Sequence, residues 1–233
     1  YTLVDSSVPA RGLLFESAFS VTELKDDYSA KEMFDAQVSA ADVKTNYSVT
    51  ILKNTGTYTL VDSSVPARGL LFESAFSVAE LKDDYSATEM QLANVSPNDL
   101  KGFYPITDIT SAYGISVLTQ EGTSFTLTDF KGQIAISTLK PQYSVAQFKA
   151  ALYTTSDLSS DFTISELKPT YSLNEMKEGF SIDIVKLNYT LFELFPEYTT
   201  TELINAGFTR RKQLESGAKI PAEYAILNEV FYD

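Results

Sequence analysis

The sequence predicts an all-α solenoid, a fold in which very short capped helices stack with a repeat of about nine residues. Three observations indicate this fold class: a nine-residue motif that recurs along the chain, a helix-capping pattern inside that motif, and prolines and glycines that fall near its ends. A fixed short period is typical of folds that stack one small unit, so each unit is expected to contact mainly its neighbours.

The motif starts with an aromatic residue, followed by Ser or Thr, two variable residues, Asp or Glu, a large aliphatic residue, often Lys, and two turn residues. Its clearest copies are residues 76–84, 162–170 and 171–179. We number its positions one to nine, starting from the aromatic residue. The motif is less regular in residues 58–75, where Val65-Pro66 begins a longer variant that Val8-Pro9 also begins.

A longer repeat lies over the short one. Residues 1–33 recur as residues 58–90, with differences only where Thr22 becomes Ala79 and Lys31 becomes Thr88. A block of 57 residues is therefore duplicated at 1–57 and 58–114. Block duplication is easily tolerated when each unit touches only its neighbours.

The solenoid is expected to span residues 1–207, followed by a C-terminal capping or docking segment at 208–233. In that segment Arg210-Arg211-Lys212 replaces the acidic part of the motif, and a longer apolar helix is predicted from about Ile220 to Phe231. Terminal repeats that depart from the consensus commonly cap a solenoid.

Positions two and five of the motif match a capping box. In this arrangement a Ser or Thr side chain accepts a hydrogen bond from the backbone N–H three residues later, and the acid at that residue accepts one from the N–H of the cap. The aromatic residue before the cap and the aliphatic residue after the acid form a hydrophobic staple. The predicted pairs are Ser20 with Glu23, Ser29 with Glu32, Ser39 with Asp42, Ser77 with Glu80, Ser86 with Glu89, Ser96 with Asp99, Thr126 with Asp129, Thr154 with Asp157, Thr163 with Glu166, Ser172 with Glu175, Thr190 with Glu193 and Thr199 with Glu202.

Prolines and glycines support this register. Pro97 falls at the first helical position and Pro105 at a cap, where a missing N–H costs little. Pro141, Pro169 and Pro196 fall at position eight, where they end a helix. Gly179 and Gly207 precede the next motif, so we expect left-handed helix ends there. The helices should cover little more than positions three to seven.

Packing must hold such short helices, because isolated helices below about 12 residues are marginal in water. The residues at positions one, three and six are expected to face a shared interior. A buried aromatic side chain removes roughly 150 to 250 Å² from water, which outweighs the ~1 kcal/mol of a cap.

A β-solenoid is the alternative fold, since Thr, Val, Ile and Tyr suit strands. Strand geometry would place the acid at position five on the same face as the aromatic residue and the aliphatic residue on the opposite face. That pattern buries charge or splits the core, so short helices are favoured. The case for helices is weakest in residues 115–142, which are rich in Thr and Ile.

Composition excludes several kinds of chemistry. The chain has 233 residues, a net charge of -13, and no Cys, His or Trp. Thiol nucleophiles, disulfides and imidazole chemistry are therefore absent. The acidity argues against binding nucleic acid or anionic membranes, and no apolar run is long enough for a membrane span.

The sequence predicts no catalytic, cofactor-binding or metal site. Asp26-Asp27 and Asp83-Asp84 lack the spaced ligands of a Ca²⁺ loop, and capping already explains acids such as Glu23, Glu80 and Glu166. Glycosylation sequons start at Asn46, Asn94 and Asn188, but the motif itself generates them, and we expect their neighbouring residues to be engaged in packing and capping.

The motif resembles tandem short-helix repeats of the aromatic-Ser-x-x-Glu-Leu-Lys type in long repeat proteins of giant viruses, algae and bacteria. The resemblance covers residues 19–208 and implies a structural or interaction role without active-site residues. The turn in those repeats is usually Ala-Gly, whereas this chain has Asp83-Asp84 and Pro169-Thr170.

These observations favour a non-enzymatic scaffold protein, an elongated element of a larger virion, filament or surface assembly. Its expected partners are other proteins or copies of itself, without nucleic acid, cofactor or membrane insertion. The alternative is an extracellular adhesion or recognition module that binds carbohydrate or a cell surface through exposed Tyr, Thr and Asp side chains.

Overall fold

The computed structural model describes residues 3, 12, 18–62, 68–71 and 75–208 of the chain. The chain divides into two compact units, Tyr1–Phe125 and Thr126–Asp233, and each is described by itself. Val8-Pro9, Val65-Pro66, Arg210-Arg211-Lys212 and the helix expected from Ile220 lie outside the described residues.

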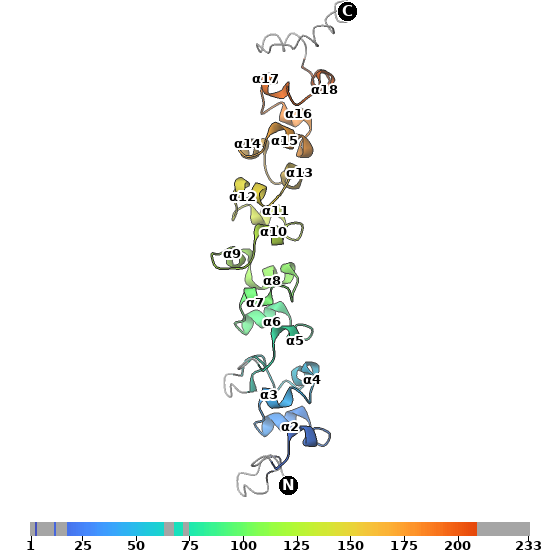
Figure 1. Cartoon of the computed structure of the whole chain (residues 1–233), viewed down its shortest axis with the longest axis vertical. Coiled ribbons are helices and arrows are strands. Elements are labelled where there is room, and N and C mark those ends of the chain that lie inside the picture. Colours follow the sequence, from blue (N-terminus) through green and yellow to red (C-terminus); the bar gives the residue numbers. More distant parts are fainter. Residues whose placement is uncertain (1–2, 4–11, 13–17, 63–67, 72–74, 209–233) are drawn as a thin grey trace, which may run out of the picture. The chain divides into compact units, whose positions relative to one another are not determined.

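Both units consist of short α-helices joined by turns (Figure 1). The first unit contains α1 (Val21–Leu24), α2 (Ala30–Asp35), α3 (Ala40–Val43), α4 (Val49–Asn54), α5 (Val78–Leu81), α6 (Ala87–Leu92), α7 (Pro97–Leu100), α8 (Ile106–Tyr113) and α9 (Ile115–Leu118). The second contains α10 (Leu127–Phe130), α11 (Ile136–Leu139), α12 (Val145–Ala150), α13 (Thr155–Leu158), α14 (Ile164–Leu167), α15 (Leu173–Gly179), α16 (Ile182–Val185), α17 (Leu191–Leu194) and α18 (Thr200–Asn205).

The all-α prediction is confirmed, and the β-solenoid is not supported. In the described part of the chain the only bridge is an isolated one between Lys101 and Tyr104. The Thr- and Ile-rich residues 115–142 form α9, α10 and α11. Many helices cover only positions three to six, and the residue at position seven, such as Lys168 after α14, is the C-cap.

Position six provides the centre of the core. The position-six residues of all the described helices are at most 5% exposed: Leu24, Met33, Val43, Leu52, Leu81, Met90, Leu100, Ile109, Leu118, Phe130, Leu139, Phe148, Leu158, Leu167, Met176, Val185, Leu194 and Leu203. Position three is buried or half-buried, as in Ile164 and Leu173. The aromatic residues at position one are mostly buried, with Phe19 as an exposed exception.

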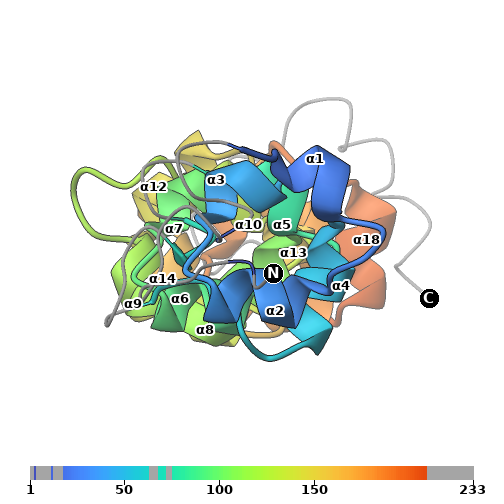
Figure 2. The ribbon, with the colours of Figure 1, turned by 90° about the horizontal axis from the view of Figure 1, so that it is seen from below.

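Motifs that lie two and three steps apart in the chain contact one another. Helix α13 packs against α15, and α6 packs against α8. Tyrosine hydroxyls make the same connection: Tyr171 donates to the carbonyl of Tyr153, and Tyr104 donates to that of Tyr85. Seen end-on, the helices α1, α2, α3 and α4 lie on different sides of the first unit (Figure 2). Each unit is thus a tight coil of helical turns.

Gly179 corrects one prediction. Gly207 has the expected left-handed backbone, with φ 86°, but Gly179 is the last residue of α15 and is not left-handed. A Cβ atom on Gly179 would overlap the backbone carbonyl of Thr155 in α13. The hydroxyl of Thr155 also donates to the carbonyl of Glu175. The glycine therefore allows α13 and α15 to approach closely, which local turn rules do not reveal.

Substitution of Leu167 by Ala tests the core. Leu167 is fully buried, so losing its side chain should lower the free energy of unfolding by roughly 2 to 5 kcal/mol. Denaturant titration measures this change. Leu152→Ala, at a site that is 78% exposed, should change stability by no more than about 0.5 kcal/mol. Equal effects of the two substitutions would contradict the stacked core.

Substitution of Gly179 by Ala tests the close approach of α13 and α15. The new methyl group must push the helices apart, so we expect a loss of about 1 to 3 kcal/mol. Gly132→Ala is the control, because Gly132 has a left-handed backbone with open space around it, and only backbone strain of about 1 kcal/mol is expected. A neutral Gly179→Ala would contradict the tight contact.

Candidate functional site

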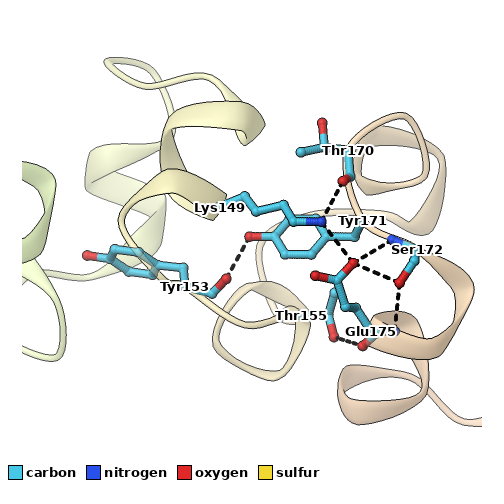
Figure 3. Close-up of polar contacts among 7 residues, drawn as sticks. All are labelled: Lys149, Tyr153, Thr155, Thr170, Tyr171, Ser172 and Glu175. Carbon is cyan, nitrogen blue, oxygen red and sulfur yellow. Dashed lines mark hydrogen bonds and ion pairs between the residues drawn. The ribbon is translucent and has the colours of Figure 1, made fainter.

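Capping boxes form at the start of many helices, and the one before α15 is typical (Figure 3). The backbone N–H of Glu175 donates to the Ser172 hydroxyl at 3.3 Å, and the N–H of Ser172 donates to Oε2 of Glu175 at 2.7 Å. Two N–H groups that a helix start leaves without partners are thereby satisfied.

Most of the predicted pairs form both hydrogen bonds. These are the boxes at Ser20, Ser29, Ser86, Thr154, Thr163, Ser172, Thr190 and Thr199. At Ser77 and Thr126 the acid accepts from the cap N–H, and at Ser39 the hydroxyl accepts from the N–H of Asp42. Ser96 departs from the prediction, because its hydroxyl accepts from Asn98 instead of Asp99.

Ser144 forms a further box with Gln147, which the search for acidic partners missed. The amide oxygen of Gln147 accepts from the Ser144 N–H at 2.8 Å. The signal in the sequence is Gln147 at position five, where an amide can take the place of the acid in a capping box.

Lysine at position seven has a role that the sequence analysis did not identify. The ammonium group of Lys149 donates to the carbonyl of Thr170 at 2.9 Å and to Oε2 of Glu175 at 2.8 Å, and it lies 4.9 Å from the centre of the Tyr171 ring (Figure 3). We call this arrangement of carbonyl, carboxylate and ring around one ammonium group a lysine clamp. It joins two motifs that are three steps apart in the chain.

The lysine clamp recurs in both units. The complete set of carbonyl, carboxylate and ring surrounds several lysines, among them Lys53, Lys131, Lys140, Lys149 and Lys168. Lys44 contacts the ring of Phe76 and the carboxylate of Glu80, and Lys101 and Lys177 each contact a carbonyl and a ring. The same lysine position therefore connects successive turns of the coil repeatedly.

The sequence does contain a signal for the clamp. Among the motifs whose helices the structure describes, five lack an acid at position five. In four of them the motif three steps earlier also lacks lysine at position seven, and the exception is Ile51, which lies 26 residues after Lys25. The pairs are Val117 with Gln91, Thr138 with Thr110, Gln147 with Thr119, and Ile184 with Ser159. Acid and lysine thus tend to vary together over a separation of about 26 residues, whereas a capping box alone has no need of a distant lysine.

Several carboxylates that contact a lysine have strongly lowered pKa values. Hydrogen bonds from Lys149 and from the backbone N–H and hydroxyl of Ser172 lower the pKa of Glu175 to about 2. Hydrogen bonds from Lys140 and from the Thr163 cap do the same for Glu166. The pKa of Glu23 is also lowered, there by the hydrogen bonds of Ser20. The clamp and the cap therefore favour the same ionised carboxylate.

Buried tyrosines complete the connection between motifs. The Tyr171 hydroxyl donates to the carbonyl of Tyr153 at 2.7 Å, and burial raises the pKa of Tyr171 to about 12. Tyr104 makes the same contact with Tyr85 at 2.7 Å, and burial raises the pKa of Tyr104 to about 12. These hydroxyls remain neutral at physiological pH and serve as structural donors.

The aspartate pairs that were considered as Ca²⁺ sites lie in other contacts. Asp83 pairs with Lys82 at 2.8 Å, Asp26 with Lys25 at 3.5 Å, and Asp84 accepts from the Thr50 hydroxyl at 2.6 Å. Among the residues that the structure describes, no group of three or more acidic side chains is arranged to hold a metal ion.

The three sequon asparagines lie in turns between helices. Asn188 accepts a hydrogen bond from the Ser165 hydroxyl at 2.9 Å, and Asn46 donates to Thr45 at 3.0 Å. Asn94 has a left-handed backbone with φ 59°. Their neighbours Ser48 and Thr190 cap helices α4 and α17, as expected.

The clamps are suited to holding motifs together and poorly suited to proton transfer. A general acid needs a pKa near the working pH, whereas the capping and clamp hydrogen bonds lower the pKa values of Glu80, Glu166, Glu175 and Glu193 to about 2. Their lysine partners are engaged by several acceptors at once. These groups therefore act as a permanent ion-pair framework.

Comparisons with protein-family models, with curated proteins and with solved structures found no match to this chain. In the part of the chain that the structure describes, no helix combines the length and the apolar character that crossing a bilayer requires.

Substitution of Glu175 by Gln separates the cap from the clamp. Gln can keep the bond to Ser172, as Gln147 does at Ser144, but it loses the charge that Lys149 contacts. The pKa of Glu175 is lowered from 4.5 to about 2, so its stabilising effect is complete above pH 4.5 and is lost as the pH falls towards 2. Since the carboxylate is partly exposed and screened, we expect the variant to be less stable at pH 7 by about 0.5 to 1 kcal/mol.

Denaturant unfolding at a series of pH values measures this effect, and the difference between the two proteins should vanish near pH 2. Gln147→Glu is the matched control, because the motif three steps earlier has Thr119 instead of lysine. Gln147→Glu should make the free energy of unfolding depend more on pH, but by less than Glu175→Gln reduces that dependence. A Glu175→Gln effect that is the same at every pH would contradict the clamp.

Proposed function

We propose that the protein is a non-enzymatic repeat scaffold that acts through protein–protein contacts as an element of a larger assembly. The lysine clamp is the observation that carries this proposal. In the clamp, the repeated carboxylates, lysines and aromatic rings join motifs to one another. The ionisable side chains of the motif are therefore engaged in contacts that hold the coil together.

Apolar side chains on the surface also support protein contacts. In the second unit Leu187 is 78% exposed and Phe192 is 67% exposed. Exposed apolar side chains are suitable contact points for another protein.

Recognition of carbohydrate or a cell surface is the alternative that the sequence left open. It depends on exposed tyrosine, threonine and aspartate side chains. The tyrosines of the described residues are buried or half-buried, and many Ser and Thr side chains form caps. A scaffold role therefore has the better support.

Affinity purification of the full chain from its native source tests the proposal. We expect the chain to elute with one or a few proteins at a constant ratio that persists through gel filtration. Leu187→Ser and Phe192→Ser should reduce partner recovery. The melting temperature of both variants should remain unchanged because both sites are exposed. Leu152→Ser is the matched control for an equally exposed site.

Two results would overturn the proposal. One is a defined turnover that a single carboxylate substitution abolishes while the fold stays intact. The other is saturable binding on a glycan array together with recovery of the chain free of protein partners, which would favour recognition.

A further inference from the structure

The motif at residues 104–112 has the aromatic ring, the carbonyl and the carboxylate of a lysine clamp, but the lysine itself is directed elsewhere. In a complete clamp the ammonium group contacts the aromatic ring, the carbonyl of the preceding residue and the carboxylate at position five. The equivalent groups of the motif at residues 104–112 are the Tyr104 ring, the Phe103 carbonyl and the Asp108 carboxylate. Lys82 is the lysine three motifs earlier, and its ammonium group pairs with Asp83 at 2.8 Å instead.

A groove of about 560 Å³ lies at this position, with Lys82, Tyr104 and Asp108 in its lining. The other charged residues that line it are Asp83, Asp84 and Glu89, so negative charges outnumber positive ones. Phe103, at its edge, is 45% exposed. A groove of this composition favours a positively charged guest with an aliphatic stem.

The Asp108 carboxylate is available to such a guest because it does not close a capping box. The cap of α8 is Pro105, which has no N–H to donate, whereas Glu175 is held by the N–H of Ser172. Asp108 accepts a long hydrogen bond of 3.4 Å from the Thr107 hydroxyl. No lysine of the described residues lies within ion-pair distance of it.

An aspartate at position five can form a clamp. Asp157 accepts from Lys131 at 3.2 Å, and Lys131 lies 5.1 Å from the centre of the Tyr153 ring. The shorter side chain of Asp108 is therefore no obstacle, and the groove presents the same three groups that hold lysine elsewhere in this chain.

We propose that the groove at Phe103, Tyr104 and Asp108 binds a lysine side chain from a basic segment of a partner protein. The guest ammonium group takes the place that Lys149 takes beside Tyr171 and Glu175. This inference rests on the proposed function, because a protein partner supplies the lysine, and it names the chemistry by which that partner is recognised.

Titration of the full chain with the peptide acetyl-Gly-Gly-Lys-Gly-Gly-amide tests the inference. We expect saturable binding, with the largest shifts of backbone amide resonances at Phe103, Tyr104 and Asp108. The same peptide with an acetylated lysine side chain should not bind, because it lacks the charge. Asp108→Asn should weaken binding about three- to tenfold.

Asp27→Asn is the matched control, because it removes the same charge at an exposed site outside the groove. It should leave the affinity of the peptide unchanged. Equal weakening by Asp108→Asn and Asp27→Asn would show attraction to the acidic surface as a whole, and it would overturn the proposal.

Lys82→Ala distinguishes a guest lysine from an internal one. We expect this variant to keep the melting temperature of the wild type and to bind the peptide at least as tightly. The proposal would be overturned if Lys82→Ala lowered the melting temperature as much as Lys149→Ala does and the wild-type protein did not bind the peptide. These results together would show that Lys82 fills the groove. That result would not affect the constant partner ratio on which the scaffold proposal depends.

Discussion

A helix of four residues is not stable by itself, and this constraint explains the contacts that recur throughout the protein. Fixing the first helical turn costs more conformational entropy than its single hydrogen bond returns. Each motif therefore adds a cap at the start of the helix, a buried side chain at position six, and connections to motifs two and three steps away. The helices exist because these contacts act together.

The position-five carboxylate links local structure to the stacking of motifs. In Glu175 the same oxygen accepts from the Ser172 N–H, which starts α15, and from Lys149, which belongs to an earlier turn of the coil. A partly exposed ion pair alone contributes little to stability. Combined with an aromatic ring and a turn carbonyl that needs a donor, it also fixes which motifs lie against each other.

This double use gives the repeated acidic side chains a structural role. Their hydrogen bonds hold them ionised, and their positions repeat from one motif to the next. Departures from the repeat are therefore the more informative places. Pro105 frees Asp108 from the cap, and Lys82 pairs with its neighbour Asp83, so the groove beside Tyr104 presents clamp groups that other motifs use internally.

The sequence by itself determined the helical class, the start of most helices and the residues of the core. These features depend on interactions within one motif, such as Thr163 with Glu166, or on a periodic apolar pattern that ends in residues such as Leu167. The tertiary structure decided which motifs touch, and the sequence carries only an incomplete trace of this in the spacing of lysine and acid. The reach of Lys149 to Tyr171, the contact of Gly179 with Thr155 and the groove at Asp108 all depend on how many motifs complete one turn of the coil. That number follows from the packing of side chains between turns, which the pattern within a single motif does not contain.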